Sequence, residues 1–164
     1  MATLRAHGIE ATLPGGFEGR IFVRPRTADE TPRPVAHFST FPLPSGVGDF
    51  GGGAVTSMRS DDIFAVLFEY GPESVGTRLF ARQGMPSSLT PDDFLPTVLR
   101  RGITGQAGTQ WFFTEVGRPF TFYAVLGDHS RRNLLVPRVN ALLSAIRVSS
   151  GQPAPAPTPA APWN

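Results

Sequence analysis

Cysteine and lysine are both missing from this 164-residue chain, and each absence removes a class of chemistry. Without cysteine there is no disulfide framework, no thiolate nucleophile and no cysteine-ligated zinc or iron–sulfur site. All 15 basic residues are arginine, so a Walker-type phosphate loop, which needs a lysine, is excluded. Charged residues make up 17% of the chain and the formal net charge is +2. This small charge disfavours a nucleic-acid-binding protein, which needs a strong basic patch.

Long apolar runs are missing as well. No segment approaches the roughly 18 apolar residues that a membrane span needs, and residues 1–16 carry no apolar run of signal-peptide length. We therefore expect a cytoplasmic chain without membrane insertion. The hydrophobic content of 40%, with 13 phenylalanines, fits one folded domain over residues 1–150. The Pro/Ala-rich tail 151–164 cannot build a core and favours polyproline II or disorder.

Apolar residues that alternate with polar ones predict several antiparallel strands. The strongest strand signal is at 62–71, where both faces are apolar, so we expect a central strand that is covered on both sides. A Gly-Gly turn predicts that the strands on either side of it, 8–14 and 19–25, form a hairpin. Strands are also expected at 35–41, at 54–59, at 77–83 and twice within 109–127, around a turn near Gly117.

Two segments predict helices. In 87–102, Thr90 suits the N-cap and Pro91 the first helical position, although Pro96 removes a backbone donor and should bend the helix. In 131–148, apolar residues recur at helical spacing.

The stretch SGVGDFGGG, residues 45–53, contains a formal G-x-G-x-x-G. A dinucleotide fingerprint needs a strand before these glycines and a helix after them. Here Pro42 and Pro44 break the preceding strand, and the residues that follow alternate like a strand. We interpret 45–53 as an inter-strand loop, with Phe50 available to anchor it or to contact a partner.

Neighbouring Asp, His and Ser side chains at 128–130 do not form a catalytic triad, because triad members converge from separate parts of a fold. We expect Asp128 or Ser130 to cap the following helix. A composite metal site that joins His37 to Asp61 or Asp62 stays open, but no cofactor or metal is predicted. The three histidines lack the spacing of metal ligands: His7, His37 and His129.

Two regions suggest contact with a protein partner. Arg131 and Arg132 lie near a helix start, the less favourable end for cations, so they are either solvated or face an acidic partner. In the tail, Pro155 and Pro157 suit a groove that accepts polyproline II, and Trp163 is a candidate anchor. The tail either docks on a neighbour or folds back on its own domain.

The order of the motifs LPGGF, TPDDFLPTVLRRG, WFFTEVGRPFTFYAVLG and RVNALLSAIRV resembles that of the Mog1/PsbP-like α+β fold over about residues 8–148. The resemblance implies an antiparallel sheet of about six to eight strands with helices packed on its faces. It also implies proteins that are mostly not enzymes and that bind other proteins, such as a small GTPase, photosystem subunits or secretion effectors. No catalytic residue carries over.

We therefore expect a non-catalytic protein-binding adaptor, chaperone or accessory subunit, or a homo-oligomer, that needs no cofactor. The alternative is a small-molecule binder or an enzyme, with a cleft under loop 45–53. In that alternative Asp49, Asp128 and His129 are the polar groups of the site.

Overall fold

The computed structural model describes residues 1–23, 33–43 and 53–150. Within these residues the chain is of the α+β class, with two antiparallel sheets and one α-helix. The strands are β1 (Thr3–Ala6), β2 (Ile9–Thr12), β3 (Glu18–Val23), β4 (Pro34–Ser39), β5 (Ile63–Glu69), β6 (Ala107–Glu115), β7 (Arg118–Leu126) and β8 (Ile146–Val148), and the helix is α1 (Arg132–Ala145). Short 3₁₀ turns occupy Val55–Ser57, Pro72–Ser74, Arg78–Phe80, Pro91–Asp93, Pro96–Val98 and His129–Arg131.

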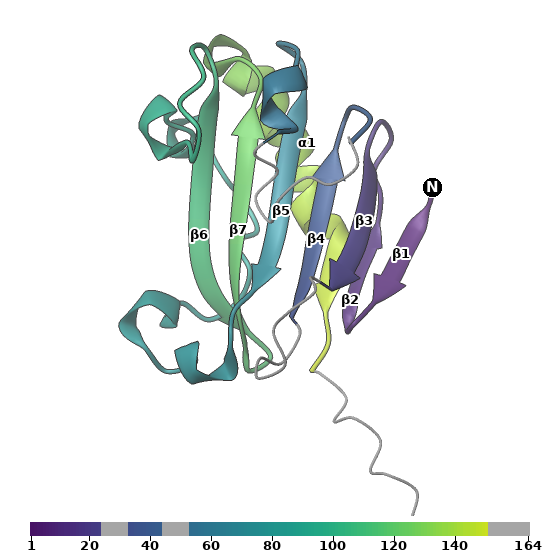
Figure 1. Cartoon of the computed structure of the whole chain (residues 1–164), viewed down its shortest axis with the longest axis vertical. Helices are drawn as coiled ribbons and strands as arrows, with labels where there is room; N and C mark the ends of the chain where they lie inside the picture. Colours follow the sequence, from purple (N-terminus) through teal and green to yellow (C-terminus); the bar gives the residue numbers. More distant parts are fainter. Residues whose placement is uncertain (24–32, 44–52, 151–164) are drawn as a thin grey trace, which may run out of the picture.

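The larger sheet has five strands in the order β3-β4-β5-β7-β6, all antiparallel (Figure 1). β5 lies at its centre and every residue of β5 is buried, which confirms the prediction of a strand covered on both faces. β6 and β7 form the predicted hairpin around Gly117, with Glu115 paired to Arg118 across a two-residue turn.

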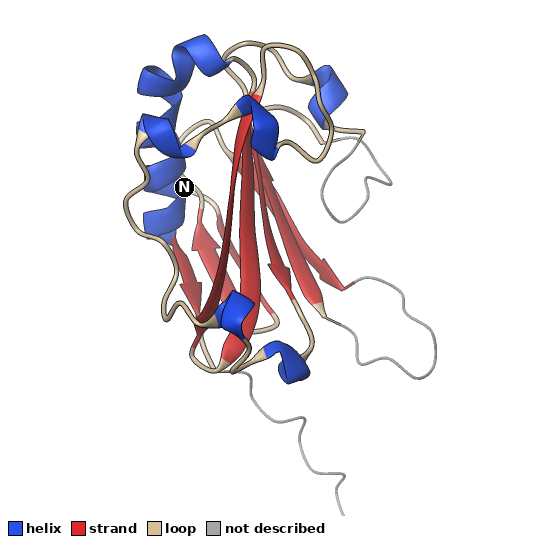
Figure 2. Ribbon diagram, turned by 90° about the vertical axis from the view of Figure 1, so that its left-hand side faces the viewer, coloured by secondary structure: helices blue, strands red, loops and turns tan. Residues whose placement is uncertain are grey.

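The smaller sheet has the order β1-β2-β8, and together with α1 it covers one face of the larger sheet (Figure 2). The core of this layer joins apolar side chains from both sheets and the helix, among them Ile9, Phe38, Leu67, Phe122 and Leu142. No helix in the described part of the chain is long and apolar enough to cross a membrane.

The opposite face of the larger sheet is covered by loop segments instead of an α-helix. Val66 and Tyr123 from the sheet pack with Val55 of a 3₁₀ turn and with the loop residues Leu99 and Ile103. The prediction of helices on the faces of the sheet is therefore correct for one face only, within the residues that the structure describes.

The predicted hairpin between 8–14 and 19–25 is wrong. β2 pairs with β1 and with β8, whereas β3 pairs with β4 in the other sheet. The two-residue turn at His7 and Gly8 makes a shorter hairpin, between β1 and β2, that the alternation pattern did not reveal.

The predicted helix over 87–102 is also wrong. This segment contains two separate 3₁₀ turns, Pro91–Asp93 and Pro96–Val98, and no α-helix. Thr90 does begin the first turn, and the Asp93 carboxylate accepts a hydrogen bond from the Thr90 backbone N–H, so the capping signal was correct although the helix was not. Pro96 prevents continuation, because it cannot donate the hydrogen bond that an α-helix would need there.

Three further segments differ from expectation. Residues 54–59 contain the 3₁₀ turn Val55–Ser57, and residues 77–83 contain the turn Arg78–Phe80, where strands were predicted. The last helix ends at Ala145, and its expected final turn is instead β8, because Ile146 turns its side chain into the core while its backbone pairs with β2.

Candidate functional site

An open groove of about 890 Å³ lies at one end of the described part of the molecule. We name it the base groove. It is built around the β1–β2 turn and the end of β8, and its wall includes Pro34 at the start of β4. Residues of the base groove that carry polar side chains are Arg5, His7, Glu10, Arg147, Ser149 and Ser150.

Tight turns place the backbone of this region. His7 and Gly8 both have positive φ angles, 52° and 76°, and Ala6 pairs with Ile9 across them. Val116 and Gly117, between β6 and β7, repeat this arrangement with φ angles of 46° and 76°. Two positive φ angles in a two-residue turn match the right-handed twist of antiparallel strands, so both turns hold their hairpins closely.

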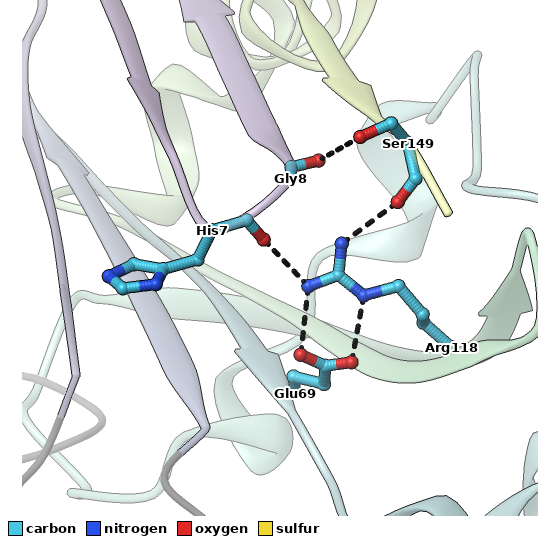
Figure 3. Close-up of polar contacts among 5 residues, drawn as sticks. All are labelled: His7, Gly8, Glu69, Arg118 and Ser149. Atoms are coloured by element: carbon cyan, nitrogen blue, oxygen red, sulfur yellow. Dashed lines mark hydrogen bonds and ion pairs between the residues drawn. The ribbon is translucent and has the colours of Figure 1, made fainter. Parts of the chain in front are cut away.

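Arg118 joins these elements in a cluster that we call the Arg118 clasp (Figure 3). Its guanidinium donates to both carboxylate oxygens of Glu69, at 2.8 and 2.9 Å. It also donates to the backbone carbonyls of His7, at 3.0 Å, and Ser149, at 2.9 Å. The Arg118 side chain is 11% exposed and that of Glu69 8%. The clasp therefore ties the end of β5 and the start of β7 to the base groove.

The glycine in the first turn is required by the clasp. A Cβ atom at Gly8 would lie 2.6 Å from Nη1 of Arg118 and 3.2 Å from Oγ of Ser149. The Gly8 carbonyl in turn accepts from the backbone N–H of Ser149, at 2.8 Å, and from its hydroxyl, at 3.3 Å. The segment that follows β8 is thus held against the β1–β2 turn by both sheets.

A row of three charged side chains crosses the solvent face of the smaller sheet. Arg5 of β1 is paired with Glu10 of β2, and Glu10 is paired with Arg147 of β8. Nε of Arg5 lies 2.7 Å from a Glu10 carboxylate oxygen. Within the described residues Arg147 is exposed and makes no hydrogen bond or ion pair. We call Arg5, Glu10 and Arg147 the charge ladder.

The ladder sets the electrostatics of the groove. The hydrogen bond from Arg5, and then its charge, lower the pKa of the Glu10 carboxyl, and Arg147 adds a smaller effect in the same direction. Glu10 consequently stays ionised at neutral pH. Two guanidinium groups and one carboxylate leave the ladder with one excess positive charge.

A second, smaller hollow of about 250 Å³ lies on the other side of the clasp. Glu69 and Arg118 line it together with Arg33, Tyr70 and Pro72. The clasp thus separates two surface hollows, and its side chains are already committed to each other and to backbone carbonyls. Its arrangement suits a structural support for the groove.

The two arginines predicted to meet a partner are already engaged within the fold. Nη1 of Arg131 lies 2.6 Å from a carboxylate oxygen of Asp61, and Arg132 donates to the carbonyl of His129. Asp61 and Arg131 remain well exposed, with 72% and 46% of their side chains accessible. Neither arginine lines the base groove.

The other polar candidates have local structural partners. Asp128 accepts from both the backbone N–H and the hydroxyl of Ser130, so the predicted cap is present, and it precedes the 3₁₀ turn that leads into α1. These bonds lower the pKa of the Asp128 carboxyl. Asp62 accepts from Thr40 and from the backbone of Arg59, which closes the turn before β5.

His37 is fully buried between the rings of Phe22 and Phe64, in edge-on contact with both. Within residues 1–23, 33–43 and 53–150, no three His, Asp or Glu side chains form a group that could hold a metal ion. The composite site of His37 with Asp61 or Asp62 is not formed, since Asp61 pairs with Arg131 and Asp62 closes a turn.

Several predicted contact residues lie outside the described residues: Asp49, Phe50, Pro155, Pro157 and Trp163. The loop 45–53 also lies there, except for Gly53. The residues of the base groove were not predicted from the sequence. One local signal was available, because His7-Gly8 between short alternating segments is typical of a two-residue hairpin turn.

No protein-family model, no curated protein and no solved structure matches this chain. The resemblance to the Mog1/PsbP-like fold is therefore untested, and the class that the structure defines is a mixed α+β domain with two antiparallel sheets.

Proposed function

We propose that this protein is a non-catalytic accessory protein that binds a segment of another protein in the base groove. In this proposal it acts as an adaptor, a chaperone or a subunit of a larger assembly. The proposal includes membership of the Mog1/PsbP-like group, whose proteins mostly bind other proteins. It takes precedence over an enzyme with a cleft under loop 45–53, because Asp128 is occupied as a cap.

The observation that carries the proposal is the construction of the base groove. Its volume of about 890 Å³ is at the upper end of the range for small-molecule pockets, yet the groove is open to solvent rather than enclosed. Its walls are strand ends and turns, and the Arg118 clasp hydrogen-bonds to the backbone of two of them, at His7 and Ser149. An open groove of this kind favours an extended segment over a small ligand, because small ligands bind in pockets that enclose most of their surface.

The test is affinity capture that compares the full-length chain with two variants, Ser150→Trp and Ser88→Trp. Ser150 lines the groove, so a tryptophan there fills it, whereas Ser88 is an exposed serine that does not line it. We expect proteins captured from a lysate of the source organism by the unmodified chain and by S88W to be lost with S150W. Capture of the same proteins by all three chains would contradict binding in the groove.

A further inference from the structure

We propose that the base groove selects an acidic segment of the partner, in extended conformation, with carboxylate side chains at alternate positions. This inference rests on the proposed function and names the chemistry of its ligand. Arg147 and Arg5 are the residues that recognise the carboxylates. Glu10, which lies between them, competes with the ligand carboxylates for Arg5.

The first argument for an acidic ligand is the charge on the groove wall. The ladder holds two guanidinium groups and one carboxylate, and His7 lies at the end of the same groove. Arg147 is exposed and its guanidinium donors make no hydrogen bond within the described residues. A planar guanidinium with open donors suits a carboxylate, because it can donate two parallel hydrogen bonds to it.

The second argument is the spacing of the charge ladder, which fits an extended peptide. Arg5 and Arg147 lie on β1 and β8, with β2 between them, so their backbones are about 10 Å apart. In an extended peptide, alternate side chains lie on the same side and about 7 Å apart. The long, flexible arginine side chains can compensate for the difference between these two spacings, about 10 Å and about 7 Å. Two carboxylates at positions i and i+2 of the peptide can therefore bind both guanidinium groups.

The third argument is the Arg5–Glu10 ion pair. Its 2.7 Å contact shows that a carboxylate on the groove wall can bind the guanidinium of Arg5 directly. Because the Arg5 side chain is 74% exposed and that of Glu10 36%, an incoming carboxylate can reach Arg5 and compete with Glu10 for it. Loss of the Glu10 charge should therefore strengthen ligand binding, while loss of the Arg147 charge should weaken it.

The experiment measures fluorescence anisotropy of labelled octapeptides with the full-length chain, at low and at physiological salt. The acidic probe alternates Asp with Ser, and the neutral probe alternates Asn with Ser. The variants are Arg147→Gln, Glu10→Gln and, as a matched control, Arg78→Gln. Arg78 is exposed in the 3₁₀ turn Arg78–Phe80 and does not line the groove, so its loss changes the net charge by the same amount.

We expect the acidic probe to bind at least about tenfold more tightly than the neutral probe, and more tightly at low salt. R147Q should lower the affinity for the acidic probe about tenfold, and E10Q should raise it. R78Q should leave this affinity within about twofold of that of the unmodified chain. Equal affinity for the two probes, no binding of the acidic probe, or an equal effect of R147Q and R78Q would overturn the inference. Neutral-probe binding that S150W abolishes would leave the proposed function intact while removing the acidic selectivity.

Discussion

At the scale of single residues, the most consequential contact is that between Arg118 and Glu69. The Glu69 side chain is only 8% exposed, so its carboxylate needs a partner, and Arg118 donates two hydrogen bonds to it. Cζ of Arg118 also lies 5.1 Å from the centre of the Phe120 ring. The same guanidinium also holds two backbone carbonyls from the smaller sheet. One side chain therefore satisfies a buried charge and joins the two sheets.

Replacement of Arg118 by alanine should strongly destabilise the protein. The substitution leaves the Glu69 carboxylate buried without a counterion, for which a loss of about 3–5 kcal/mol in the free energy of unfolding is typical. Urea denaturation of the purified variant measures this loss. A second variant, Glu69→Gln with Arg118→Gln, removes both charges and should recover part of the stability. A free energy of unfolding for R118A within 1 kcal/mol of the unmodified chain would contradict the role of the clasp.

The Asp128 cap predicts a pH dependence of stability. Hydrogen bonds from the Ser130 hydroxyl and then from its backbone N–H lower the Asp128 pKa below its ordinary value of 3.8. A depressed carboxyl pKa stabilises the fold above the unfolded-state value, and this contribution disappears as the pH falls through the folded-state value. The unmodified chain should therefore exceed Asp128→Asn in stability at pH 7, and the difference should shrink below pH 4.

Denaturation of both chains at several pH values gives this difference directly, because the other carboxylates titrate in both and cancel. A difference that stays constant from pH 7 down to pH 2.5 would show that the Asp128 charge does not contribute through the cap.

At the scale of elements, the segment between the two 3₁₀ turns at 78–80 and 91–93 is fastened to α1 by one side chain. Oδ1 of Asn140 accepts from the backbone N–H of Leu89 at 2.8 Å, and Nδ2 of Asn140 donates to the Leu89 carbonyl at 2.9 Å. The amide thus replaces a strand partner for a residue that is only 4% exposed. This fastening lets Leu89 and Phe94 enter the core without a helix.

Asn140→Ala should release this segment. Two buried backbone groups of Leu89 would lose their partner, which costs about 1–3 kcal/mol for each group left unsatisfied. Hydrogen–deuterium exchange of the Leu89 amide should become faster, while exchange in β5 should change only as far as global stability changes. The neighbouring exposed substitution Ala141→Ser serves as the control. Unchanged protection at Leu89 would contradict the role of Asn140.

The elements show which signals in the sequence carry structural information. β5 and the β6–β7 hairpin were predicted because their patterns are local, with apolar residues on both faces in one and a Gly turn between adjacent strands in the other. The prediction of a helix over 87–102 was wrong even though its cap was correct. Pro96 and the core contacts of Phe94, which the local pattern does not show, determine the path of this segment. The four residues of β1 were too few to show a periodicity.

At the scale of the whole molecule, the base groove depends on pairings that no local pattern contains. β2 and β8 come from opposite ends of the chain, and their pairing places Glu10 beside Arg147. The β6–β7 turn places Arg118 beside His7 and Ser149. Each of these residues is ordinary in its own sequence context. The topology alone makes them neighbours, which explains why the sequence predicted the fold class but not the site.

In the proposal made above, the end of the molecule that carries the base groove is the binding surface. The turns and strand ends that line the groove are held by the clasp, while the exposed Asp61–Arg131 pair and the Asp128 cap lie away from it. The central claim is therefore that ligand binding is confined to the base groove.

The most direct test is an NMR titration of the ¹⁵N-labelled full-length chain with the alternating Asp–Ser octapeptide. The account predicts saturable shifts of the backbone amides at 5–10 and 147–150, together with that of Arg118, and no comparable shifts at Asp61 or Asp128. Saturable shifts located elsewhere, or no shifts at millimolar peptide, would contradict the claim that the base groove is the binding site.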